Sequence, residues 1–153
     1  MVTPTSPYSL PQKLESDLAQ VLTYWEGLKR GEADMPFWDD VSPSALPDLT
    51  RRLMLLEVFE KPVRFRFGTV GADLAKRYGK DFIGKFIDEI APSDPLQYLS
   101  SQASATIEKG APTYFKHQPI DTQALSAEGY ARLLLPLWGD GHIGMLLGAI
   151  TEA

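Results

Sequence analysis

The chain has 153 residues, a length that suits one domain, and its 44% hydrophobic and 23% charged residues are ordinary for a globular protein. It contains no cysteine, which excludes disulfides, thiolate nucleophiles and cysteine-ligated zinc or iron–sulfur sites. Its net charge of −5 gives no general attraction to nucleic acid or anionic lipid, and no apolar run approaches the roughly 20 residues that a membrane span needs.

Residues 1–8 contain two prolines, two threonines and a serine, which predicts a loose tail. This stretch lacks the basic start and the apolar segment of a signal peptide, so we expect a cytoplasmic protein. A helix is expected over residues 10–30, because Ser9 and Gln12 have the spacing of a capping box and Gly31 can end a helix. Tail and helix form an extension over residues 1–35, ahead of a domain over residues 36–153.

The expected helix carries one apolar stripe, whose residues recur at steps of four, three, four and three. The stripe consists of Leu14, Leu18, Val21, Trp25 and Leu28. A short helix of this kind either covers the core of its own domain or forms a seam with a second copy. Both interpretations stay open, and the five residues are therefore interface candidates.

Two strands are expected next, over residues 53–60 and 63–70. In the second strand Phe65 and Phe67 alternate with Arg64 and Arg66. Because successive side chains of a strand point to opposite faces, we expect the phenylalanines to be buried and the arginines to be solvated.

Helical pieces follow, among them residues 72–78, and a longer helix is expected over residues 93–109. Ser93 suits the N-cap of this long helix, and Gly110 stands directly after its expected end. The small residues Ser100, Ala103 and Ser104 let the helix lie close to a sheet or leave room for a small molecule between them.

The last third of the chain predicts three more strands, over residues 113–120, 129–138 and 142–151. The sequence Gly139-Asp140-Gly141 predicts a tight hairpin between the last two strands. The final strand is almost wholly apolar, as is typical of a central strand covered on both faces. Two strands, a run of helices and three strands together indicate an α+β fold with a mostly antiparallel sheet.

Several short motifs resemble those of PAS domains. The run from Tyr78 to Lys85 reads as an aromatic residue and glycine, followed by an apolar residue, glycine and lysine. Leu135-Pro136-Leu137, the glycine hairpin and the final Gly148-Ala149-Ile150-Thr151 are similar to the closing hairpin of that family. From about residue 36 to residue 153 the chain resembles a divergent PAS-like group of small, mostly single-domain bacterial proteins. The resemblance implies a five-stranded antiparallel sheet with helices on one face and a pocket under the long helix, in a sensory or protein-contact role.

If the strand alternation holds, six side chains face the long helix and surround the expected pocket. They are Phe65, Phe67, Phe115, His117, Leu133 and Leu135. Such a pocket suits a small apolar ligand, with His117 as its polar group. We therefore expect a non-catalytic sensory domain that binds this ligand or a protein partner, and that forms a homodimer or contacts a signalling protein. We expect no fused kinase, DNA-binding or cyclase domain, so a signal is expected to leave by contact.

No cofactor is expected. Haem-binding members of the family use an axial histidine, often on the long helix, and residues 93–110 contain none. The flavin photochemistry of light-sensing members requires a cysteine. His117 and His142 are isolated from each other, so the spacing of metal ligands is missing as well.

The alternative is an enzyme with a cone-shaped α+β fold, in which His117 and Asp121 transfer a proton. That fold begins with more than one long helix before its sheet, whereas this chain is expected to begin with one. The helices that precede the first strand therefore distinguish the two interpretations.

Overall fold

The computed structural model describes residues 8–78, 83–90, 98–117, 129–139 and 141–152. Five strands form one antiparallel sheet in the order β2-β1-β5-β4-β3. The strands are β1 (Leu53–Phe59), β2 (Arg64–Val70), β3 (Thr113–His117), β4 (Tyr130–Gly139) and β5 (His142–Glu152). This architecture confirms the predicted α+β fold with a five-stranded antiparallel sheet.

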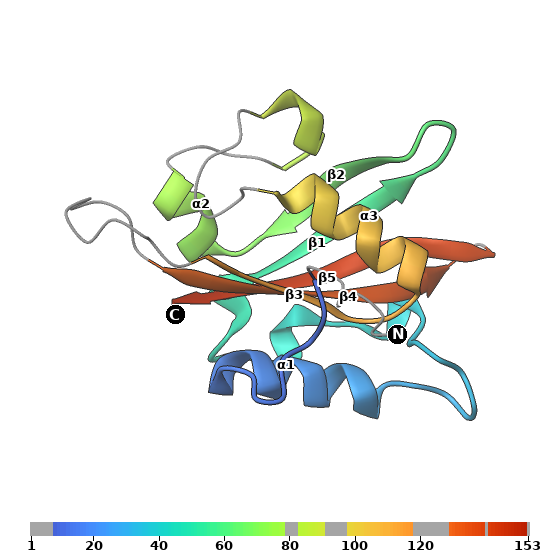
Figure 1. Ribbon diagram of the computed structural model, residues 1–153, viewed down its shortest axis with the longest axis horizontal. Helices are drawn as coiled ribbons and strands as arrows, with labels where there is room; N and C mark the ends of the chain where they lie inside the picture. The colour runs from blue at the N-terminus through green and yellow to red at the C-terminus, as the bar shows by residue number, and fades with distance from the viewer. Residues whose placement is uncertain (1–7, 79–82, 91–97, 118–128, 140, 153) are drawn as a thin grey trace, which may run out of the picture.

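Helices cover both faces of the sheet. Figure 1 shows α2 (Ala72–Tyr78) and α3 (Leu99–Lys109) on one face and α1 (Ser16–Gly27) on the other. Four short 3-10 helices complete the described elements: η1 (Trp38–Asp40), η2 (Pro43–Ala45), η3 (Thr50–Arg52) and η4 (Ile87–Glu89). The core therefore has two layers, one between the sheet and α3 and one between the sheet and α1.

The last strand, β5, lies at the centre of the sheet. It pairs with β1 on one side and with β4 on the other, and residues 146–151 are buried. A strand that is covered on both faces gains stability from apolar residues at every position. The prediction of a central last strand is therefore confirmed.

The first helix is shorter than the sequence predicts, because it begins at Ser16 and ends at Gly27 instead of spanning residues 10–30. The capping box expected at residues 9–12 is wrong: Glu15 is the N-cap residue and makes no side-chain cap hydrogen bond. The preceding chain is held elsewhere, since the carbonyl oxygen of Tyr8 accepts a 2.9 Å hydrogen bond from the Tyr114 N–H of β3. This contact ties the start of the described chain to the edge of the sheet.

The apolar stripe of α1 packs against its own sheet. Leu18, Val21 and Trp25 are each 1% exposed, and the indole Nε1 of Trp25 donates a 2.9 Å hydrogen bond to the carbonyl oxygen of Pro136. Leu14 and Leu28 are partly exposed. A dimer seam that used the three buried side chains would first have to expose them.

The long helix ends as predicted. Gly110 adopts the left-handed conformation, with φ of 61°, and its N–H donates to the carbonyl oxygen of Thr106. Glycine has no Cβ to clash in this conformation, which explains its place at the end of the helix. The described part of α3 begins at Leu99, and the cap predicted at Ser93 lies outside the described residues.

Candidate functional site

The face of the sheet under α3 brings together four of the six predicted pocket residues. Phe65 and Phe67 are 3% and 1% exposed and belong to the core layer on this face. Phe115 packs against the same layer, and His117 lies on the same face of β3 two residues further along. Their role as pocket residues remains a prediction.

The prediction that Leu133 and Leu135 face α3 is wrong. Both leucines are 0% exposed, but they belong to the layer between the sheet and α1. The error has a simple physical cause, because every residue of β4 from 130 to 137 is buried. Neither face of this strand is exposed to solvent there, so exposure does not distinguish the two faces. The side chains of β4 that do face α3 are those of Tyr130, Arg132 and Leu134.

The register between β3 and β4 places an arginine under α3. Phe115 pairs with Arg132, and His117 pairs with Tyr130, so these four side chains share one face of the sheet. Arg132 is 0% exposed. This residue was not among the predicted site residues, although a lone arginine within an apolar strand is a signal that could have identified it.

A hydrogen-bond network connects Arg132 to α3. The Nε of Arg132 donates to Oε1 of Gln102 at 2.7 Å, and Nε2 of Gln102 donates to Oγ1 of Thr113 at 3.1 Å and to the carbonyl oxygen of Arg132 at 3.2 Å. The hydroxyls of Thr106 and Thr113 lie 2.6 Å apart. Gln102, Thr106 and Thr113 are all 0% exposed, so the network lies entirely in the core. It fixes α3 to both β3 and β4.

An aromatic ring lies against this arginine and contacts further rings in turn. The Cζ atom of Arg132 lies 5.1 Å from the ring centroid of Phe115, whose ring in turn contacts three tyrosines at centroid distances of 5.7 to 6.2 Å. They are Tyr8, Tyr98 and Tyr130, and the ring of His117 stacks on Tyr130 at 5.3 Å. We call Tyr8, Tyr98, Gln102, Phe115, His117, Tyr130 and Arg132 the Arg132 cluster. Tyr98 is 60% exposed, so the cluster reaches the surface at the start of α3.

Burial lowers the pKa of Arg132 from its ordinary value to about 10, because desolvation disfavours the charged guanidinium. The phenols of Tyr130 and Tyr8 act in the opposite direction and stabilise the charge. A pKa of about 10 still leaves the side chain protonated at neutral pH. The core under α3 therefore contains a positive charge, which is costly to bury and is seldom placed in a core for packing alone.

The arginines of β2 differ from Arg132 in their surroundings. Arg64 forms a bidentate ion pair with Asp88 of η4, and Arg66 forms one with Glu57 of β1. Their side chains are 38% and 36% exposed, which agrees with the prediction that this pair lies on the wetter side of the strand. Arg66 therefore offers a matched control for Arg132.

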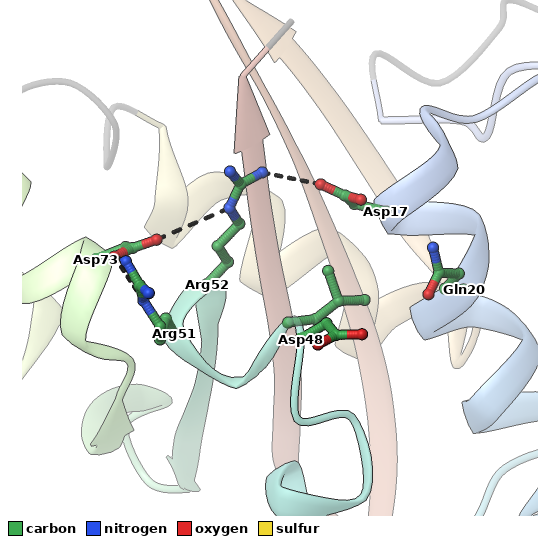
Figure 2. Close-up of a pocket in the computed structure, with 7 residues that line it drawn as sticks. Asp17, Gln20, Asp48, Arg51, Arg52 and Asp73 are labelled. Carbon is green, nitrogen blue, oxygen red and sulfur yellow. Dashed lines mark hydrogen bonds and ion pairs between the residues drawn. The ribbon is translucent and has the colours of Figure 1, made fainter.

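A polar cavity of about 350 Å³ lies at a second place, where α1, η3 and α2 meet. Figure 2 shows Arg52 between Asp17 of α1 and Asp73 of α2. Nη1 of Arg52 donates to Oδ2 of Asp17 at 2.8 Å and to Oγ1 of Thr151 at 2.9 Å, while its Nε lies 3.9 Å from Oδ2 of Asp73. Arg52 thus connects helices that cover opposite faces of the sheet. These charges pair with one another, which is typical of a structural junction.

We expect Arg52→Met to lower the free energy of unfolding by about 1–2 kcal/mol, because it removes hydrogen bonds to both Asp17 and Thr151. The neighbouring Arg51 pairs with Asp73 alone and its side chain is 71% exposed, so Arg51→Met should cost less than about 0.5 kcal/mol. Urea unfolding of the two variants measures the difference. Equal losses would show that Arg52 is an ordinary surface arginine.

Neither a membrane-spanning helix nor a cluster of metal ligands is found within the described residues. No helix in the described ranges is both long and apolar enough to cross a membrane. Across the same ranges, no three His, Asp or Glu side chains gather in a way that could hold a metal ion.

The cone-shaped enzyme fold does not match the chain. In the described ranges α1 is the one α-helix that precedes β1, whereas that fold begins with more than one long helix. Asp121, the proposed partner of His117, lies outside the described residues. The order along the chain is two strands, then α2 and α3, then three strands, all in one five-stranded sheet, and this is instead what the PAS resemblance implies.

Comparisons with known proteins agree with this architecture. A search of curated proteins finds no match to the chain. A family model described as PAS domain matches residues 14–151, from just before α1 to the end of the sheet. The match thus includes the N-terminal helix as well as all five strands. The chain belongs to the PAS domain family.

Proposed function

We propose that this PAS domain is a sensory domain that binds a small molecule in the Arg132 cluster, between the sheet and α3. The observation that carries the proposal is the buried guanidinium of Arg132, which lies against the ring of Phe115 and is held by Gln102 of α3. Ligand sites in proteins combine apolar and aromatic walls with a small number of fixed polar groups, and the cluster has this composition.

The position of the cluster supports a sensory role. Gln102 and Thr106 project from α3, while Thr113 and Arg132 belong to the sheet, so a molecule bound here acts on the bonds that hold the helix to the sheet. A ligand that favours one arrangement of these bonds shifts the position of α3. This coupling needs no chemical change in the ligand.

The polar group proposed for the site differs from the one that the sequence predicted. His117 remains in the cluster through its stacking on Tyr130, but the group that fixes a ligand is Arg132. A homodimer or a signalling partner remains a prediction of the sequence.

Native mass spectrometry of gently purified protein tests the proposal, because it reports bound small molecules and copy number together. We expect an adduct of small-molecule mass on the folded protein, which is lost on denaturation. Phe115→Ala should reduce its occupancy at least tenfold, since this ring lies at the centre of the cluster. Phe59→Ala, at an aromatic residue on β1 that contacts Phe86 and Arg66, should leave the occupancy unchanged.

If native mass spectrometry gives the mass of the chain without an adduct, ligand screening follows. In that case we expect small aromatic compounds to raise the melting temperature and to shift amide NMR signals of α3, β3 and β4. The proposal fails if the folded protein carries no adduct and no compound of such a screen shifts those signals.

A further inference from the structure

The end of α3 meets two turns of the sheet. Figure 1 shows the last turn of α3 on the same side of the molecule as the turn between β1 and β2 and the hairpin of β4 and β5. An open cavity of about 320 Å³ lies where these three elements meet. We call it the hairpin groove, and its apolar lining consists of Val58, Val63, Ile107, Trp138 and Ile143.

The hairpin groove continues the core layer between the sheet and α3 outward to the surface. Val58 and Ile143 are buried members of that layer, and Ile107 packs against it. At the mouth of the groove, in contrast, Val63 is 52% exposed and Trp138 is 38% exposed. Apolar surface that stays open beside a core favours binding of an apolar molecule, because the molecule removes this surface from water.

The size of the hairpin groove indicates a small molecule as its occupant. Ligand pockets begin at roughly 300 Å³, and the groove lies close to this limit. A specific protein interface instead buries at least about 1,000 Å² of surface. The exposed ring of Trp138 offers a flat apolar wall, against which a ring of the ligand can stack.

A carboxylate at the groove limits the charge of the ligand. Glu60 lines the groove together with His142, and Oε1 of Glu60 lies 3.3 Å from Nε2 of His142. Within the described part of the chain this is the one interaction of Glu60, so Oε2 can accept a hydrogen bond from a ligand. A carboxylate repels an anionic ligand, whereas a neutral ligand with an N–H or O–H group donates to it.

We infer that the hairpin groove binds a neutral, largely apolar ring compound with one N–H or O–H group that donates to Glu60. The inference goes beyond the proposed function, because the groove shares no residue with the Arg132 cluster and lies at the opposite end of α3. A molecule in the groove contacts Ile107, which belongs to the last turn of this helix.

Amide NMR titrations of the full chain at pH 7 with indole and with indole-3-carboxylate test the inference. The two probes share the ring and the N–H donor, but only the second carries a negative charge. We expect indole to bind at least fivefold more tightly and to shift the amide signals of Val58, Ile107 and Ile143. The compound 1-benzothiophene, which has the same shape without the N–H, should bind at least threefold more weakly than indole.

Val63→Asp should weaken indole binding at least tenfold, because it places a charge at the apolar mouth of the groove. Val63 is exposed and precedes β2, so we expect an unchanged melting temperature. Leu10→Asp is the matched control, at an apolar residue that is 38% exposed and lies ahead of α1. It should leave the indole affinity unchanged.

Glu60→Gln tests the role of the carboxylate without a change in side-chain size. The glutamine still accepts a hydrogen bond but carries no charge, so indole and indole-3-carboxylate should bind within about twofold of each other. A preference for indole that persists in this variant would show that Glu60 does not select the charge of the ligand, and would overturn this part of the inference.

Three further outcomes overturn the inference. The first is that millimolar indole does not shift the named signals, and the second is that Val63→Asp binds indole as wild type does. The third is a wild-type dimer that Val63→Asp separates in light scattering, because the groove is then an interface between copies. The Arg132 cluster has its own test in Phe115→Ala, so a failure here leaves the proposed function standing.

Discussion

Trp25→Ala is expected to lower the free energy of unfolding by about 3–5 kcal/mol, the range for removing a large aromatic side chain from a core. Trp25 is 1% exposed and fills the layer between α1 and the sheet. The substitution also leaves the Pro136 carbonyl oxygen without the indole N–H that now donates to it at 2.9 Å. Urea unfolding followed by circular dichroism measures the loss.

Glu26→Ala is the control on the same helix, because its side chain is 53% exposed and pairs with Lys29 only. It should change the free energy of unfolding by less than about 0.5 kcal/mol. Light scattering on the same samples addresses the alternative role of the stripe. A Trp25→Ala variant that keeps its stability but halves its mass would show that this helix face binds a second copy.

Gln102→Leu is expected to lower the free energy of unfolding by about 3 kcal/mol, because it removes the acceptor that Gln102 offers to the buried Nε–H of Arg132. The substitution keeps the approximate volume of the side chain but removes the Oε1 atom that accepts from Arg132 and the donor to Thr113. Arg132→Met removes the guanidinium itself, so in this background Gln102 no longer has the Nε–H to accept from.

A double-mutant cycle separates the two effects. In the Arg132→Met background, Gln102→Leu should cost only about 1 kcal/mol, so the coupling between the two positions is about 2 kcal/mol. Independent losses, with a coupling below about 0.5 kcal/mol, would show that Gln102 does not stabilise the buried guanidinium.

The same variants give a pH dependence with a definite sign. The pKa of Arg132 is about 10 in the folded protein and higher in the unfolded chain, so the unfolded state holds this proton more tightly. The cost of burying the charge is therefore fully present below pH 10 and is relieved as the pH rises above 10. Between pH 8 and pH 11, wild type should gain about 1 kcal/mol relative to Arg132→Met.

Much of the fold follows from local patterns in the chain. Two-residue periodicity and turn chemistry place the five strands close to their observed limits, and residues 72–78 form α2 as expected. The position of β5 at the centre of the sheet follows from its uninterrupted apolar sequence. These features depend on neighbouring residues alone, so the sequence by itself determined them.

Contacts between residues far apart in the sequence decided where α1 begins and which side chains form the site. The predicted cap at Ser9 and Gln12 has suitable spacing, but Tyr8 is bonded to the edge of β3, and the helix begins only at Ser16. The same physical reason applies at the site. The two-residue period of β4 places Leu133 and Leu135 on one face of the sheet and Arg132 and Leu134 on the other. Because both pairs are buried, the period alone does not determine which pair faces α3.

Pairing with β3 decides that question, because Phe115 lies opposite Arg132 and under α3. Sequence periodicity alone thus predicted a sheet and a helix above it. The tertiary structure decided that the side chain between them carries a positive charge, since register across the sheet sets which of two buried faces each residue joins.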